Sequence, residues 1–94
     1  MRVGLLVLDL FLPGCASLKE KRRVVRSLRD RIRHRHNVAA AEIDHQDLHQ
    51  RSTLAFVSVA GREEPLNKLF DQICLEAEGQ VPGGVQEATR ELLG

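Results

Sequence analysis

The sequence predicts an α+β fold of the order βαββαβ, in which a four-stranded antiparallel sheet carries two helices on one face. Three apolar runs, at residues 3–11, 38–44 and 52–60, have the length and pattern of strands. Two longer segments, at residues 17–36 and 65–79, repeat apolar residues at helical spacing. The length of 94 residues suits one domain, so we expect a single domain over residues 1–94.

The first strand is apolar on both of its faces. One face carries Val3, Leu5 and Val7, and the other carries Leu6, Leu8 and Leu10. This pattern is typical of a strand covered on both sides, whereas two helices cover only one face of such a sheet. We expect a second copy of the chain to cover the other face, which predicts a homo-oligomer. The alternative is shielding by the C-terminal segment or by long polar side chains of the same chain.

The first helix begins after the break at Pro13-Gly14. Ser17 and Glu20 form a capping box, in which the hydroxyl and the carboxylate accept hydrogen bonds from reciprocal backbone N–H groups. The helix is expected to continue to about His36. Its expected buried stripe comprises Leu18, Val25, Leu28 and Ile32.

The second half of the chain predicts a hairpin, a helix and a final strand. The strands at residues 38–44 and 52–60 are joined by a polar connection. Pro65 opens the second helix in its first turn, and Gly79 stands where a glycine just past the helix end belongs. The tail after Pro82 fits either a helix or an edge strand, and we predict a strand, which completes the βαββαβ order.

A formal net charge of +1 conceals a strong asymmetry. Residues 17–36 contain nine Lys and Arg against two acidic residues, and residues 37–94 contain four against ten. At about 100° per residue, four arginines fall within an arc of about 60° on one side of the first helix, with Lys19 beside them. The predicted polyanion-binding residues are Lys19, Lys21, Arg22, Arg26, Arg29 and Arg33.

This arginine ladder has two interpretations of about equal weight. Like charges at this spacing repel one another, so the ladder needs a compensating partner. The partner is either a polyanion, whose phosphates match the planar guanidinium fork, or the acidic residues of this chain or of a second copy. With three Phe and neither Tyr nor Trp, base stacking on the sheet is disfavoured, and contacts to the backbone of folded RNA fit better.

The densest group of ionisable residues lies at the end of the second apolar run, residues 38–44, and in the hairpin connection that follows it. A second candidate polar site comprises Glu42, Asp44, Asp47 and Arg51. The simpler interpretation is a polar connection in which Asp47 or Glu42 pairs with Arg51. His45 and His49 are four residues apart, which brings two ligands together on a helix but not in a strand and turn. We therefore expect no metal site.

No motif identifies a reaction. The phosphate-loop pattern is absent, and Cys15 lies near a positive helix end that favours a lowered pKa, but it lacks a partner base. We expect no catalytic residue and no cofactor. An enzyme with a site built from Glu42, Asp44 and the helix N-terminus is the third hypothesis for function.

The sequence also indicates a compartment. Asp9 interrupts the first apolar run, which therefore fits a buried strand better than a signal peptide. No stretch approaches the roughly 20 apolar residues that cross a bilayer. Cys15 and Cys74 are isolated thiols, as expected in a reducing environment. We expect a cytoplasmic protein that is not bound to a membrane.

Short motifs make the chain similar to a known family. The segments SLKEKR at residues 17–22, EID at 42–44, QD at 46–47 and QR at 50–51 resemble the bacterial YlxP-like family, a domain of unknown function, over nearly the whole chain. The resemblance implies a ferredoxin-like fold. Genes of that family often stand beside those for a translation initiation factor and a ribosome-binding factor, which implies a role near ribosome maturation. The family implies no catalytic residues.

These observations lead to two main hypotheses for function. The first is a small non-enzymatic protein whose arginine-rich first helix binds RNA or a ribosomal subunit. The alternative is a homo-oligomeric interaction or regulatory module whose basic helix pairs with an acidic protein surface.

Overall fold

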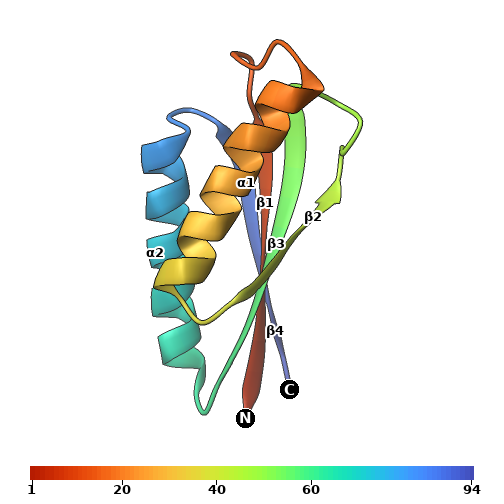
Figure 1. Ribbon diagram of the computed structural model, residues 1–94. Helices are drawn as coiled ribbons and strands as arrows, with labels where there is room; N and C mark the ends of the chain where they lie inside the picture. The colour runs from red at the N-terminus through yellow and green to blue at the C-terminus, as the bar shows by residue number, and fades with distance from the viewer.

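The elements of the chain follow the predicted order. The computed structural model describes residues 1–94, whose elements are β1 (Arg2–Phe11), α1 (Leu18–Arg35), β2 (Ala39–Asp44), β3 (Arg51–Ala60), α2 (Glu63–Gln80) and β4 (Val85–Leu93). The strands form one antiparallel sheet in the order β2-β3-β1-β4, and both helices pack on the same face of it (Figure 1). This arrangement confirms the predicted ferredoxin-like βαββαβ fold, including the strand predicted for the tail.

The core lies between the helices and one face of the sheet. The alternation along β1 directs every second side chain towards the helices, where it is buried. The sheet contributes Leu6, Leu8, Leu10, Leu54 and Phe56 to this core, and the helices contribute Val25, Leu28, Ile32, Phe70, Ile73 and Ala77. Each fully buried side chain of this size stabilises the fold by roughly 1.5–3 kcal/mol.

The start of α1 is capped almost as predicted. The hydroxyl of Ser17 accepts a hydrogen bond from the backbone N–H of Glu20 at 3.1 Å. The carboxylate of Glu20 accepts one from the N–H of Ala16 at 3.0 Å, one residue earlier than the capping box requires. The helix ends at His36, whose N–H donates to the carbonyl of Ile32. The cap therefore sets where the basic segment begins.

The buried stripe of α1 differs from the prediction at its first position. Leu18 is only half-buried, and Lys21 is fully buried in its place. Lys21, Val25, Leu28 and Ile32 follow the spacing i, i+4, i+7, i+11 and so lie on one side of the helix. Helical geometry thus places a lysine in the core, despite its charge.

The end of α2 also differs from the prediction. Gly79 does not terminate the helix, which continues to Gln80 and is capped by the N–H of Val81 on the carbonyl of Ala77 at 2.9 Å. Val81 is buried one turn beyond the buried Ala77, so apolar packing extends the helix past the glycine. The left-handed backbone conformation occurs later, at Gly83, with φ of 72°.

Neither α1 nor α2 combines the length and the apolar character that a membrane crossing requires.

Candidate polyanion-binding surface

Four cations gather on the first half of α1 and line an open groove of about 580 Å³. These residues, which we call the N-terminal cation cluster, are Lys19, Arg22, Arg23 and Arg26. All four are exposed, and no carboxylate lines the groove. None of the four takes part in any of the ion pairs that the structure contains within 4.0 Å. The cluster is therefore a surface of uncompensated positive charge.

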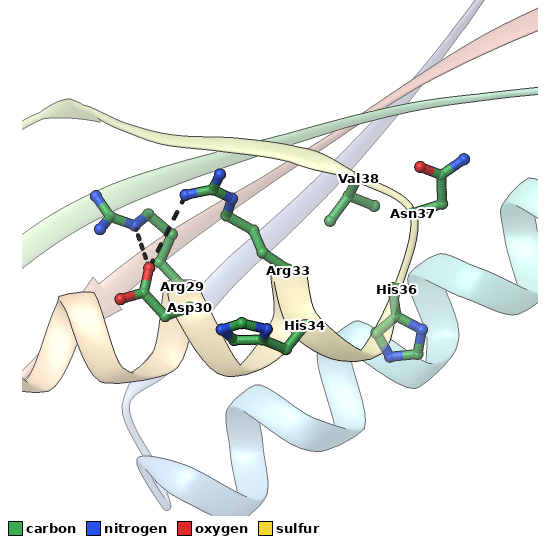
Figure 2. A pocket seen from close by; sticks show the side chains of 7 residues that line it. All are labelled: Arg29, Asp30, Arg33, His34, His36, Asn37 and Val38. Atoms are coloured by element: carbon green, nitrogen blue, oxygen red, sulfur yellow. Dashed lines mark hydrogen bonds and ion pairs between the residues drawn. The ribbon is translucent and has the colours of Figure 1, made fainter.

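The second half of α1 is different because its arginines have acidic partners. Arg29 Nε lies 3.0 Å from Asp30 Oδ1, and Arg33 Nη1 lies 4.0 Å from the same oxygen. Figure 2 shows both guanidinium groups directed towards this one carboxylate. Arg35 Nε lies 2.8 Å from Glu76 Oε1 on α2. Short-range pairing thus neutralises part of the predicted ladder but leaves its N-terminal part free.

A second pocket, of about 550 Å³, lies at the C-terminal end of α1 (Figure 2). Its lining comprises Arg29, Asp30, Arg33, His34, His36, Asn37 and Val38. Two guanidinium groups share one carboxylate here, so the pocket keeps a positive balance. His36 Nε2 lies 2.7 Å from Glu76 Oε2, which fixes the ring against α2. The basic surface therefore continues along the helix, with a lower density of free charge.

Lys21 was predicted to be part of the polyanion-binding surface, but the structure places it inside the protein. Its Nζ donates hydrogen bonds to Glu42 Oε2 at 2.7 Å, to the carbonyl of His45 at 3.0 Å and to that of Gln46 at 3.5 Å. The same Glu42 oxygen accepts a hydrogen bond from the hydroxyl of Ser52 at 2.6 Å. The ammonium group is satisfied within the chain and is not accessible to a ligand.

Arg23 is a member of the cluster that the predicted site omitted. Its exposed side chain completes the groove beside Lys19 and Arg26. The signal was present in the sequence, because residues 19, 23 and 26 follow the helical spacing i, i+4, i+7. The predicted residues lie on one side of the helix next to its buried stripe, whereas the groove also includes the side directed to solvent.

The structure does not bring the second candidate polar site together. Glu42 lies opposite Leu54 and turns towards Lys21, whereas Arg51 lies opposite Phe11 on the other face of the sheet. The expected pairing of Arg51 with Glu42 or Asp47 is wrong, because Arg51 forms no ion pair. Glu42 is a structural partner of the buried lysine instead.

The hairpin connection has a strained backbone position with a clear stabilising cause. His45 has φ of 63°, which is uncommon for a residue other than glycine. Its N–H donates to Asp44 Oδ1 at 2.7 Å, and its carbonyl accepts from Lys21 Nζ and from the N–H of Leu48.

No group of three or more His, Cys, Asp or Glu side chains in the chain is placed to hold a metal ion.

Cys15 is buried beneath the start of α1 and is a free thiol. Burial raises its pKa and the nearby Glu20 carboxylate adds to the rise, against an opposing effect of the Lys21 ammonium. The expected lowering by the helix N-terminus is therefore wrong. A thiol with a raised pKa is protonated at neutral pH, so it is a poor nucleophile.

The fold and the surface together define a ferredoxin-like α+β protein with an exposed basic helix. The chain matches the family described as "Protein of unknown function (DUF503)" over residues 3–88. It belongs to this family. No curated protein matches the chain.

Several solved structures share the fold. A variant of SnoaB, a cofactor-independent oxygenase from Streptomyces nogalater, has a TM-score of 0.56 at 8% identity, over 99% of this chain and 91% of its own. At3g17210 from Arabidopsis thaliana has a TM-score of 0.53 at 14% identity, over 98% and 93%. An antibiotic biosynthesis monooxygenase has 0.50 at 13%, over 98% and 96%. At such low identities the likeness concerns the fold alone.

Proposed function

We propose that this protein binds structured RNA of a ribosomal subunit through the N-terminal cation cluster and catalyses no reaction. One observation carries the proposal: four exposed cations line one groove without a carboxylate among them. The competing interpretation was neutralisation by acidic residues of the same chain. The acidic residues on and beside α1 are engaged elsewhere. Glu20 accepts a hydrogen bond from the N–H of Ala16, and Asp30 and Glu76 pair with Arg29, Arg33 and Arg35.

The chemistry of the cluster suits phosphate. An arginine fork donates two parallel hydrogen bonds to a phosphate, and three of the four members are arginines. The cluster covers about 10 Å of helix at 1.5 Å per residue. It also lies in the first half of α1, where the helix dipole adds positive potential. Arg29 and Arg33 extend the basic surface further along the same helix.

The surface carries no Phe, Tyr or Trp on which bases could stack. Phe56 and Phe70 are completely buried, and Phe11 lies at the end of β1 rather than on α1. Because the chain contains no other Phe and neither Tyr nor Trp, recognition would depend on the phosphate backbone and the shape of a folded RNA.

The ribosomal RNA is favoured over other polyanions by the motifs described above. The proposal includes membership of the YlxP-like group, whose genes often adjoin those for a translation initiation factor and a ribosome-binding factor. It also includes a cytoplasmic location, which the free thiols of Cys15 and Cys74 support. An acidic protein surface is the competing partner for the same cluster, and the experiment below separates the two.

The test measures the affinity for a labelled ribosomal RNA hairpin, by fluorescence anisotropy, as a function of salt. Arg22→Gln/Arg26→Gln should weaken binding and lower the log–log salt slope by about 1.4–1.8, at about 0.7–0.9 per phosphate contact. Arg62→Gln/Lys68→Gln removes the same charge from exposed positions on and before α2 and should leave the slope nearly unchanged.

Three results would overturn the proposal. They are no binding at low salt, an affinity indifferent to salt, and an equal loss in both double variants. A protein that co-sediments with ribosomal subunits through a protein component, while the isolated hairpin does not bind, would establish the acidic-protein alternative instead.

A further inference from the structure

The face of the sheet turned away from the helices is apolar at its centre. Figure 1 shows both helices on one side of the sheet, which leaves this second face without a cover. The strand registers place on it Val3, Leu5, Val7, Ala39, Ala41, Ala55, Val57, Val59 and Leu93. Val59 is 56% exposed and Leu93 is 46% exposed. Antiparallel sheets usually present polar residues to water, so this face has the character of an interface.

The charged residues of the open face are unevenly distributed. Asp9 and Glu87 are cross-strand neighbours on β1 and β4, and Arg51 lies near the same end on β3. Glu91 lies opposite Leu5, further along β4. Asp44 on β2 lies opposite Thr53, in the same row as Asp9 and Glu87, and lies 3.9 Å from the ring of its neighbour His45. Arg51, Asp9, Glu87 and Glu91 form no ion pair in the chain. The face therefore offers opposite charges to a partner across the central strands.

We propose that a second copy of this chain covers the open face, sheet against sheet, about a two-fold axis. With this axis parallel to the strands, the sheet order β2-β3-β1-β4 lays β1 of each copy over β3 of the other with the same ends together. Arg51 of one copy comes next to Asp9 of the second copy, and the contact occurs twice by symmetry. The apolar residues of β1 and β3 meet at the centre.

Two sheet-on-sheet arrangements differ in which charges meet. A two-fold perpendicular to the strands would lay β4 over β4 in opposite directions. The register pairs Glu87 with Asp9 and Glu91 with Leu5, and these two positions lie equally far on either side of Val7. Glu87 of one copy would then lie over Glu91 of the second copy. Like charges facing each other in an interface are strongly unfavourable. The strand-parallel axis avoids that contact and adds the Arg51–Asp9 pair, but it lays β4 over β2 and so brings Glu87 near Asp44 of the second copy. The charge-reversal experiment below therefore decides between the two axes.

The area of the face is adequate for a dimer. Four strands about 4.8 Å apart and nine residues at about 3.3 Å give a footprint of roughly 500 Å² per copy. Because side chains protrude from the sheet, the accessible surface is larger than this flat footprint. The accessible surface buried by the two copies together therefore exceeds about 1,000 Å², which a specific interface requires. Because α1 lies on the opposite face of each sheet, the dimer leaves both N-terminal cation clusters exposed, and this inference is independent of RNA binding.

Sedimentation equilibrium over a concentration series tests the interface. The wild-type chain should dimerise, and Val57→Asp should raise the dissociation constant at least about tenfold, because it buries an unpaired charge. Leu75→Asp is the matched control, since Leu75 is 74% exposed on α2, outside the face. It should leave the dissociation constant unchanged. Far-UV circular dichroism confirms that each variant is folded.

Charge reversal tests the orientation without disturbing the core. Arg51→Glu should weaken the dimer, Asp9→Lys should also weaken it, and the two together should restore most of the affinity. A wild-type chain that stays monomeric at high micromolar concentration overturns the interface, as does a dimer insensitive to both Val57→Asp and Arg51→Glu. A dimer sensitive to Val57→Asp but without rescue by the double reversal overturns the strand-parallel axis.

Discussion

The buried ion pair between Lys21 and Glu42 provides the sharpest test of how this fold is held together. Lys21→Met keeps the aliphatic stem in the core and removes the ammonium group. Removing one partner of a buried pair costs about 3–5 kcal/mol. The Glu42 side chain is 19% exposed and keeps its hydrogen bond from Ser52, so water and the hydroxyl partly compensate it. We therefore expect the lower end, about 3 kcal/mol.

The complementary change leaves Lys21, the more buried partner, without its counter-ion. Glu42→Gln retains the shape of the side chain but removes its charge, and the ammonium of Lys21 then depends on the carbonyls of His45 and Gln46. Lys21 is fully buried, so we expect a larger loss, about 4 kcal/mol. Domains of this size have a total stability of roughly 5–14 kcal/mol, so either change removes a large fraction of it.

The assay is urea unfolding followed by far-UV circular dichroism, because the chain contains no Trp and no Tyr for a fluorescence signal. With a slope of about 1–3 kcal/mol per molar, a loss of 3 kcal/mol lowers the urea midpoint by about 1–3 M. Lys68→Met is the matched control, because Lys68 pairs with Glu64 at 3.8 Å on the surface of α2. It should lower the stability by less than about 1 kcal/mol.

A double-mutant cycle decides whether the pair itself is responsible. Lys21→Met/Glu42→Gln should lose less stability than the sum of the single losses, with a coupling of at least about 1 kcal/mol. A loss of stability for Lys21→Met no larger than that for Lys68→Met would contradict the stabilising role of the buried pair. Two single losses that simply add in the double variant would contradict it as well.

Three further perturbations follow from the same contacts. Ser17→Ala removes the acceptor for the N–H of Glu20 and should lower the free energy of unfolding by about 1 kcal/mol in a urea titration. Gly4→Ala brings a Cβ within 2.8 Å of the buried Phe70 ring, so we expect a loss of about 1–3 kcal/mol and a drop in Tm of several degrees by calorimetry. Because burial raises the pKa of Cys15, its contribution to stability is complete below the ordinary thiol pKa and is lost as pH rises through the higher folded-state pKa. The stability of the wild type should therefore fall more steeply than that of Cys15→Ala between neutral and alkaline pH, and parallel pH profiles would contradict this.

Local patterns predicted the elements well because helices and strands depend on near neighbours. The period of two in residues 3–11 and the helical spacing after Ser17 both report which side chains share a face, and both elements were found. Gly79 shows the limit of this reasoning. Glycine favours a helix end, but the burial of Val81 one turn later outweighs that local preference.

Lys21 shows the same limit at the binding surface. Its charge suggested exposure, although its spacing from Val25 already placed it on the buried side of α1. Glu42 makes the burial of Lys21 tolerable, but it lies 21 residues away in the chain. A pattern of near neighbours cannot predict a contact over that separation. Arg23 was the opposite case, because its spacing from Lys19 was sufficient to find it.

The order of the elements, the concentration of positive charge on one helix and the apolar character of both faces of β1 are all predictable from the amino-acid sequence. These properties are sums and periodicities along the chain, so they require no knowledge of what lies nearby in space. Which charges from different elements meet depends on the fold. Ion pairing falls off within a few ångströms, and Glu76 of α2 reaches Arg35 near the end of α1, whereas no carboxylate lines the groove formed by Lys19, Arg22, Arg23 and Arg26. The pairs of Asp30 with Arg29 and Arg33 lie within one helical turn and are readable from the sequence, but the free half of the helix is visible only in the folded chain.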